Sequence, residues 1–337
     1  MEVRQVRIID THFHWYPRSH FERLRRRATY PRVERDGDDY VYLYNQGRSN
    51  LRLPPVWFDL DAALAFMDET GHDTAVVCTT GVLSGLVDQL PPEEAVDVAI
   101  EYNEQMAAMQ QRHPGRFYGT AMIPLQATAE AVRLTEQAVN QLRLHAVNLP
   151  AVAGEDLIDA GRLDPFYAQV EHLRVPLIVH PTDILYGEVL HGYEGAVHLT
   201  IGRLLDSSLT ILRLVFSGVL ERHPDLNVIH THAGGLLPYQ AGRIDKNSRA
   251  VTGLSDRPSA YLKRMFVDTV APQALTIRTA VEFYGAEKVV YGTDYPCWDP
   301  RAALRVMEEA QLGPEQEAMV FARNAEALLG LGVPAAR

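Results

Sequence analysis

The chain contains little cysteine and no long apolar run. Cys78 and Cys297 are the only cysteines among its 337 residues. Their wide separation excludes a disulfide framework and is typical of a protein from a reducing cytoplasm. No stretch of about 18 apolar residues is present, so we expect no membrane-spanning helix. Residues 1–5 lack the apolar segment of a signal peptide. The sequence therefore predicts a cytoplasmic protein that does not act on a membrane.

The chain also lacks an excess of basic residues. Its formal net charge is −11, whereas nucleic-acid-binding proteins usually carry a basic surface. The single basic run, at residues 23–27, is typical of a solvated face or of a contact with another subunit. We therefore expect no nucleic acid as partner. Hydrophobic residues make up 47% of the chain, which is enough for a substantial core.

Short β-rich segments alternate along the chain with segments of helical period. The pattern predicts helices at residues 62–70, 93–112, 129–142, 165–173 and 272–284. It predicts strands at residues 6–12, 74–80, 118–123, 146–149, 175–180, 227–232, 265–268 and 288–294. This alternation is typical of an α/β protein with a closed (β/α)8 TIM-like barrel. An open doubly wound sheet is the alternative, although the sequence has no glycine-rich dinucleotide turn. We expect residues 1–337 to form one domain.

Two segments are longer than a minimal barrel requires, and they follow the first and fifth strands. Long insertions after barrel strands lie on the catalytic face. We therefore expect residues 15–58 to form a lid or a substrate-binding wall. Residues 181–226 contain an apolar segment, 199–220, which is too apolar for a fully solvated helix. This segment predicts a subunit interface, or else a helix that packs on its own barrel.

Histidines and an aspartate stand at the ends of three predicted strands. His12 and His14, in "IIDTHFH", project from the same face of an extended strand because side chains alternate. His180 ends "VPLIVH", and Asp294 follows "KVVYGT". Taken singly, each has an ordinary interpretation, such as a helix cap or a hydrogen-bonded core histidine. Because barrel strands end at a common face, the four together predict a metal site with three nitrogen ligands and one oxygen ligand.

The ordered motifs "DTHFH", "IVHP", "HAGGLLP", "FVDT" and "YGTDYP" resemble those of the amidohydrolase superfamily. Within it they resemble the decarboxylase branch typified by aminocarboxymuconate semialdehyde decarboxylase. The resemblance implies a metal-dependent, non-oxidative decarboxylase whose substrate is an aromatic or muconate-type carboxylic acid. It places His12, His14, His180 and Asp294 on metal-ligand positions, with Asp294 also in the catalytic set. It places His232, in "HAGG", on the position of the catalytic histidine.

Two positions depart from related patterns. Thr231 stands where members of this branch often have glycine before the catalytic histidine, which leaves the shape of the pocket open. Asn148 stands at the end of the fourth strand, where binuclear hydrolases of the superfamily carry a metal-bridging lysine. This favours one divalent ion rather than two. We expect zinc, with manganese as the alternative.

Breaking a carbon–carboxylate bond requires a proton carrier and cations that hold carboxylates. Histidine is the side chain most often used to carry protons at neutral pH, so His232 suits the first role, whereas we interpret His230 as a structural residue. Arginines fork onto carboxylates. Arg52 and Arg48, in "QGRSNLRLPP", are candidates, and Arg52 agrees better with the substrate arginine of the family. A surface arginine is the alternative. The resemblance also implies that Arg243, in "GRID", enters the active site of a neighbouring subunit, and therefore a homodimer or larger homo-oligomer.

Two other functions remain open at this level. One is a hydrolase of a lactone, ester or amide on the same scaffold. The other is a metal-binding protein without catalysis, which would leave His232 and the arginines of the first insertion without a role. Release of carbon dioxide distinguishes a decarboxylase from a hydrolase.

Overall fold

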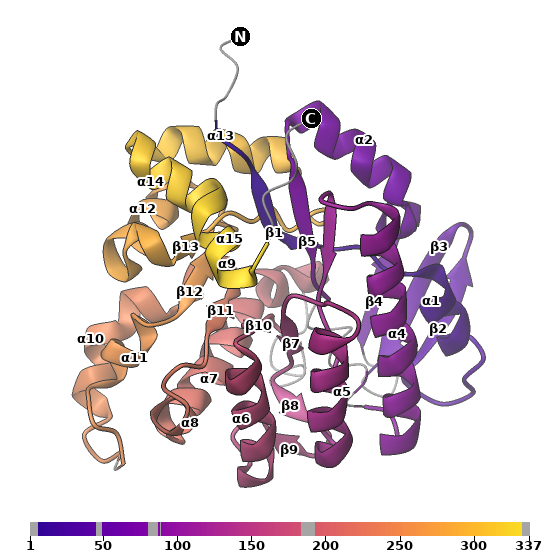
Figure 1. Cartoon of the computed structure of the whole chain (residues 1–337), viewed down its shortest axis with the longest axis horizontal. Coiled ribbons are helices and arrows are strands. Elements are labelled where there is room, and N and C mark those ends of the chain that lie inside the picture. The colour runs from indigo at the N-terminus through magenta and orange to yellow at the C-terminus, as the bar shows by residue number, and fades with distance from the viewer. Residues whose placement is uncertain are drawn as a thin grey trace.

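The computed structural model describes residues 6–44, 49–79, 87, 89–182, 193–251 and 253–331. Within these residues, two parallel sheets occupy the centre of the molecule (Figure 1). One sheet has the order β1-β5-β6 and the other β13-β12-β11-β10-β7. Their strands are β1 (Ile9–Phe13), β5 (Thr74–Val77), β6 (Phe117–Gly119), β7 (Val147–Leu149), β10 (Leu177–Val179), β11 (Val228–His230), β12 (Phe266–Asp268) and β13 (Val289–Val290).

Parallel bridges connect the two sheets at both seams. Ala121, just beyond β6, pairs with Val147 of β7, and Phe13 of β1 pairs with Tyr295, beyond β13. The strand order is therefore that of the expected (β/α)8 barrel. A strand is present at each of the eight predicted places, and each strand is shorter than the sequence pattern indicated.

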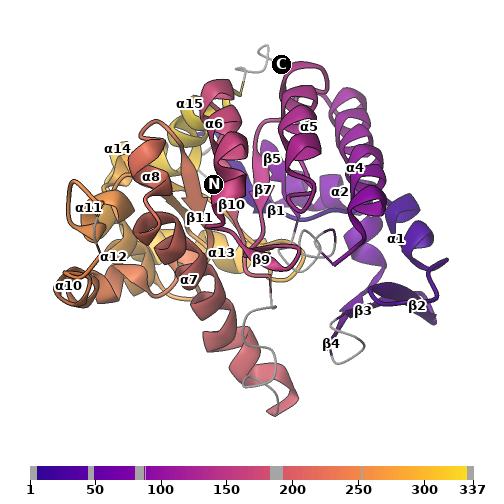
Figure 2. The same cartoon turned by 90° about the horizontal axis from the view of Figure 1, so that it is seen from below.

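Helices surround the strands, as the views in Figures 1 and 2 show. The five predicted helices are present, and α2 begins after Asp59, whose side chain accepts a hydrogen bond from the amide of Ala62. No helix of the described residues has the length and apolar character needed to cross a membrane. The helices are α1 (Arg18–Leu24), α2 (Leu60–Thr70), α4 (Pro92–Arg112), α5 (Thr128–Asn140), α6 (Asp164–Leu173), α7 (Arg203–Phe216), α8 (Val219–Arg222), α9 (Thr231–Gly234), α10 (Leu237–Asn247), α11 (Pro258–Leu262), α12 (Ala274–Tyr284), α13 (Pro300–Ala310), α14 (Pro314–Ala318) and α15 (Asn324–Leu329).

Apolar side chains from the barrel strands meet in one buried cluster. Ile9, Ile178, Ile229 and Val290 belong to it, and Leu329 of α15 packs into the same cluster. These residues come from strands on different sides of the ring, so the cluster is the interior of the barrel. The interior is thus a packed core, and polar groups gather beyond the carboxyl ends of the strands.

The first insertion has regular structure that its sequence pattern did not predict. After α1 it forms an antiparallel sheet, β2 (Arg32–Asp36), β3 (Asp39–Tyr44) and β4 (Ser49–Leu53). The sequence nevertheless contains a signal for the hairpin of β2 and β3, a glycine at the turn followed by tyrosines at alternate positions. Gly37 takes a left-handed φ of 61° at the turn, and Tyr40, Tyr42 and Tyr44 alternate as buried residues along β3.

The apolar segment of the second insertion divides into two parts. Ile211 and Leu214 of α7 are fully buried against the barrel. Leu199 and Ile201, in the π-helical turn η5 (His198–Gly202) that leads into α7, are 56% and 51% exposed. Figure 2 shows the start of α7 extending away from the barrel. The second half of residues 199–220 therefore packs on the barrel of its own chain, and for the exposed first half the subunit interface stays a prediction. Residues 183–192 lie outside the described residues.

Candidate metal centre

Four buried side chains meet beyond the carboxyl ends of the strands. His12 lies on β1, His14 directly follows β1, His180 directly follows β10, and Asp294 lies four residues beyond β13. One ligand atom from each residue lies within 4.8 Å of those of the others. The structure thus brings together the four residues that the sequence analysis selected as metal ligands.

Each of the three histidine rings has an oxygen acceptor at Nδ1. Because a carboxylate or carbonyl oxygen can only accept, Nδ1 carries a hydrogen and Nε2 remains for a ligand. The acceptors are Asp268 Oδ2 for His12 at 2.7 Å, the Cys78 carbonyl for His14 at 2.9 Å and the Pro181 carbonyl for His180 at 3.2 Å.

The Asp294 carboxylate faces the Nε2 atoms of this cluster. Its Oδ1 lies 2.9 Å from Nε2 of His14 and 3.4 Å from Nε2 of His12. Nε2 of His12 is buried and has no hydrogen-bonding partner in the described part of the chain. The cluster offers three imidazole nitrogens and one carboxylate, and one of these nitrogens is buried without a hydrogen bond among the described residues. This set fits a divalent ion such as zinc or manganese.

The charges of the cluster are strongly coupled. Burial alone lowers the pKa of His12, but the carboxylates of Asp294 and Asp268 outweigh it and raise that pKa to about 10. Burial, followed by the positive charge of His12, lowers the pKa of His180 well below its usual range. The two carboxylates therefore favour positive charge at Nε2 of His12, the nitrogen that faces Asp294. A proton and a cation compete for this nitrogen.

His232 reaches the cluster through a turn rather than along a strand. The prediction that β11 extends to residue 232 was wrong, because the strand ends at His230. Ile229 faces the barrel interior, so His230 faces outward, with its Nε2 3.1 Å from Ser207 of α7. The chain then takes left-handed φ angles, 56° at His232 and 54° at Ala233. This turn places the His232 ring 5.2 Å from those of His12 and His180.

Two glycines make this turn possible. Gly234 and Gly235 have φ angles of 80° and 58°. A Cβ on Gly234 would lie 2.5 Å from the hydroxyl of Tyr284, and one on Gly235 would lie 2.6 Å from the hydroxyl of Ser208. The "HAGG" sequence is thus required by close packing as well as by backbone conformation.

Thr231 fixes the proton position on His232. Its hydroxyl donates to the Val179 carbonyl at 2.8 Å and lies 3.2 Å from Nδ1 of His232. Since the hydroxyl hydrogen is used, the hydroxyl oxygen accepts from Nδ1–H. Nε2 of His232 then keeps its lone pair and lies 3.8 Å from Asp294 Oδ2.

Asn148 uses its amide to connect neighbouring strand ends. Its Oδ1 accepts from the amide of Thr79 at 3.2 Å. Its Nδ2 donates to the Thr120 hydroxyl and to the Ala121 carbonyl, both at 2.8 Å. The residue at the position of the bridging lysine is therefore engaged in holding the barrel together.

Of the two predicted substrate arginines, Arg52 is paired elsewhere within its own chain, and Arg243, which is predicted to enter the site of a neighbouring subunit, is not tested by a single chain. Arg52 lies on β4, where its guanidinium pairs with Asp36 and, at 2.9 Å, with Asp39. Arg48 lies outside the described residues. Arg243 lies on an exposed face of α10, one helical turn after Tyr239, which is 61% exposed.

Two residues at the site were given no role from the sequence. Asp268, in the "FVDT" motif, accepts from the ring of His12. Trp57, from the first insertion, stacks on His14 with ring centroids 5.9 Å apart and planes 14° apart. Asp268 could have been identified from its position at the end of a predicted strand. The stacking of Trp57 depends on the fold of the insertion, and the sequence contains no signal for it.

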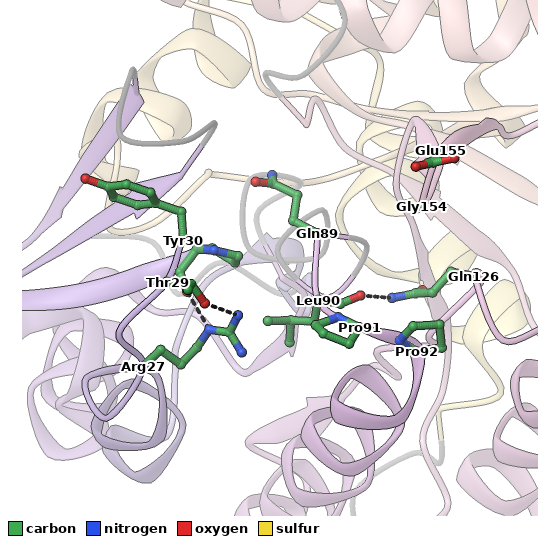
Figure 3. Close-up of a pocket in the computed structure, with 11 residues that line it drawn as sticks. Arg27, Thr29, Tyr30, Gln89, Leu90, Pro91, Pro92, Gln126, Gly154 and Glu155 are labelled. Carbon is green, nitrogen blue, oxygen red and sulfur yellow. Dashed lines mark hydrogen bonds between the residues drawn. The ribbon is translucent and has the colours of Figure 1, made fainter.

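A separate pocket of about 750 Å³, drawn in Figure 3, is lined by residues of the first insertion and of the loops after β5, β6 and β7. None of the four clustered residues lines it. Arg27, its basic lining residue, pairs with Glu94 and donates to the Pro31 carbonyl at 2.7 Å. Its guanidinium is therefore already engaged within the chain, so the pocket is a weaker candidate for binding a carboxylate.

The family model described as "Amidohydrolase" matches residues 9–331. The chain belongs to the amidohydrolase family. A 2-amino-3-carboxymuconate-6-semialdehyde decarboxylase from Dictyostelium discoideum is 25% identical over 244 residues, which cover 71% of this chain and 67% of that protein. A gamma-resorcylate decarboxylase from Rhodococcus jostii (strain RHA1) is 26% identical over 295 residues, which cover 80% of this chain and 87% of that protein.

Solved structures share the fold of this amidohydrolase-family chain. One is a dihydroxybenzoic acid decarboxylase from Polaromonas sp. JS666, crystallised with manganese and the inhibitor 2-nitroresorcinol. It matches with a TM-score of 0.78 and 21% identity, covering 97% of this chain and 98% of that one. The relatives named here are carboxy-lyases, in agreement with the resemblance noted in the sequence.

Proposed function

We propose that this amidohydrolase-family protein is a metal-dependent, non-oxidative decarboxylase of an aromatic or muconate-type carboxylic acid. The observation that carries the proposal is the buried cluster of three histidines and Asp294, with His232 beside it. Decarboxylases among the relatives of the chain support the choice of reaction.

The reaction breaks the bond between the substrate carbon and its carboxylate. Carbon dioxide leaves, and the electron pair that remains on carbon takes up a proton. A divalent ion held by His12, His14, His180 and Asp294 would polarise a substrate oxygen as a Lewis acid. We assign the proton transfer to His232: Nε2, which faces the cluster while the Nδ1 side is engaged by Thr231, takes up a proton from solvent and then delivers it to the carbon, which returns Nε2 to its lone-pair form.

We propose one ion per chain, zinc with manganese as the alternative. Three imidazole ligands suit zinc, while manganese is the ion in the Polaromonas structure. The engagement of Asn148 with its neighbours supports a single ion, since no lysine stands there to bridge two.

We also propose a homodimer in which Arg243 completes the site of the second subunit. The exposed Leu199 and Ile201 suit an interface. Arg243 lies six residues beyond the start of α10, about 9 Å along the helix axis. Its exposed position on that helix fits a contact with another subunit. Arg52 stays a candidate for the substrate carboxylate, and it would have to leave Asp36 and Asp39 to reach one.

A panel of hydroxybenzoates and aminomuconate-type acids tests the reaction. We expect ultraviolet loss of a substrate together with stoichiometric carbon dioxide. In His232→Ala, bound metal should be retained while turnover falls about 100-fold or more. Substrate loss without carbon dioxide would indicate the hydrolase instead. Unchanged turnover in His232→Ala would mean that His232 is structural.

Mixing two inactive variants tests the role of Arg243. If Arg243→Ala and His232→Ala exchange subunits, a hybrid dimer contains one site made of two intact halves. We expect activity to return in proportion to the hybrid. Exchange demonstrated by mass without recovered activity would mean that Arg243 acts in its own subunit or has no catalytic role.

A further inference from the structure

The carboxylate of Asp268 lies between the two halves of the site. The residue ends β12 and is 1% exposed. Its Oδ2 lies 2.7 Å from Nδ1 of His12. Its Oδ1 accepts from the amides of Ala233 at 2.9 Å and Val270 at 3.0 Å. One side chain thus contacts a candidate metal ligand and the turn that carries His232.

We propose that Asp268 is a positioning residue that couples the metal site to the proton carrier. Through Oδ2 it fixes the ring of His12, and through Oδ1 it holds the turn that aims His232. This inference rests on the proposed metal site and adds to it a residue whose role is set by geometry.

The first half of the coupling concerns the proton on His12. A carboxylate accepts and cannot donate, so Nδ1 of His12 must carry a hydrogen. Nε2 is then the nitrogen available to a metal, and the short contact also fixes the rotation of the ring. Carboxylates that hold metal-bound histidines in this way typically change metal affinity by about 10- to 100-fold.

The second half concerns the backbone at His232. Two consecutive residues that are not glycine, His232 and Ala233, have left-handed φ angles, which L-amino acids rarely adopt. The bond from the Ala233 amide to Asp268 Oδ1 is one of the contacts that hold this conformation. Without it, the turn can relax and move the ring of His232 away from the cluster.

Asp10 provides a matched control in the same neighbourhood. It is also a fully buried carboxylate, and it accepts from the amide of His12 at 3.0 Å and from the amide of Thr293 at 3.1 Å. Its other oxygen accepts from the Thr293 hydroxyl at 2.5 Å. In the described structure its partners are amides and a hydroxyl, so it does not set the proton position on a histidine ring.

The substitutions Asp268→Asn and Asp268→Ala separate the two halves. In Asp268→Asn the amide oxygen stays with the two backbone amides, because turning it away would lose two hydrogen bonds to keep one. The amide NH2 group then donates to Nδ1 of His12 and moves the ring proton to Nε2, where the metal binds. We expect zinc and manganese affinity, measured by chelator competition, to fall about 10- to 100-fold. At saturating metal, turnover should stay within about threefold of the wild type.

Asp268→Ala removes both contacts. We expect the same loss of metal affinity, faster hydrogen exchange at the Ala233 amide, and turnover at saturating metal lower by about tenfold or more. Asp10→Asn should keep metal affinity within about threefold. Equal affinities in Asp268→Asn and Asp10→Asn would overturn the first half. An Ala233 amide that exchanges at the wild-type rate in Asp268→Ala would overturn the second.

A measurement on the wild type keeps the inference testable if a variant does not fold. In the zinc-loaded protein, nitrogen-15 NMR should show a slowly exchanging Nδ1–H on His12, and absence of this signal contradicts the proposal. The affinity, exchange and NMR measurements need no decarboxylation. A wild type that binds metal but releases no carbon dioxide would therefore reject the proposed reaction and leave the role of Asp268 to its own test.

Discussion

Replacing Thr231 with valine should impair His232 without removing the metal. The substitution exchanges a hydroxyl for a methyl group on a side chain that is 1% exposed. It removes the hydrogen bond to the Val179 carbonyl and the acceptor for Nδ1 of His232. His232 is then free to carry its proton on either nitrogen, and in part of the molecules Nε2 has no lone pair with which to take up the proton that it delivers to the carbon.

The size of the effect follows from the single hydrogen bond that selects the proton position. Such a bond contributes about 1 kcal/mol net. Because about 1.4 kcal/mol corresponds to tenfold in rate, turnover should fall about fivefold. The free energy of unfolding should fall by about 1 kcal/mol for the buried bond to Val179. KM should change little, since Thr231 is not among the groups proposed to hold the substrate.

Steady-state kinetics with a metal-saturated enzyme provides the measurement, and two variants complete it. Thr231→Ser keeps the hydroxyl and should restore turnover. Thr120→Val removes a comparable buried hydroxyl, which donates to the Val77 carbonyl at 2.9 Å, and should reduce stability while leaving turnover within about twofold. Wild-type turnover in Thr231→Val, or equal losses in the serine and valine variants, would refute the reasoning.

Three further predictions concern metal, acid stability and assembly. Elemental analysis should find one divalent ion per chain, lost in His12→Ala; full occupancy in that variant would contradict the assigned ligands. Burial and the charge of Arg23 lower the pKa of His20 to about 4, so between pH 6.5 and 4 the unfolded chain binds a proton that the folded chain does not, and stability falls as the pH falls. Denaturant titration should show that the free energy of unfolding falls between pH 7 and pH 5 by about 2 kcal/mol less in His20→Leu than in the wild type. Equal losses in the two proteins would reject this cause. Sedimentation should show a dimer that dissociates when Leu199 and Ile201 are both changed to aspartate, whereas an unchanged mass would place the interface elsewhere.

The barrel and the position of its metal cluster followed from sequence because both depend on short-range patterns. A buried parallel strand is recognised by its apolar run, and residues just after such strands must meet at one face. His180 and Asp294, more than 100 residues apart in sequence, could therefore be assigned to one site. The same reasoning failed at His232, because strand alternation does not predict a left-handed turn held by Asp268 and two glycines.

The features that the sequence did not predict share a different cause. The sheet formed by β2, β3 and β4 depends on pairing between segments, and its alternating tyrosines were overlooked in a region without helical period. The orientation of Arg52 depends on that pairing, because Asp36 and Asp39 reach it only across the hairpin. Stacking of Trp57 on His14 likewise requires the folded insertion. Sequence patterns locate elements, whereas contacts between elements decide which side chain faces the site.

The hydrogen bonds of Asn148 restrict how this protein could evolve a second metal. A change to lysine would remove, in one step, the acceptor of the Thr79 amide and the donor for Thr120 and Ala121. Both threonines lie at ends of other strands, so compensating changes would be needed at those positions before the lysine became tolerable. The substitution is therefore accessible only in certain genetic backgrounds. A library that varies positions 79, 120 and 148 together should yield folded lysine variants that single replacement does not.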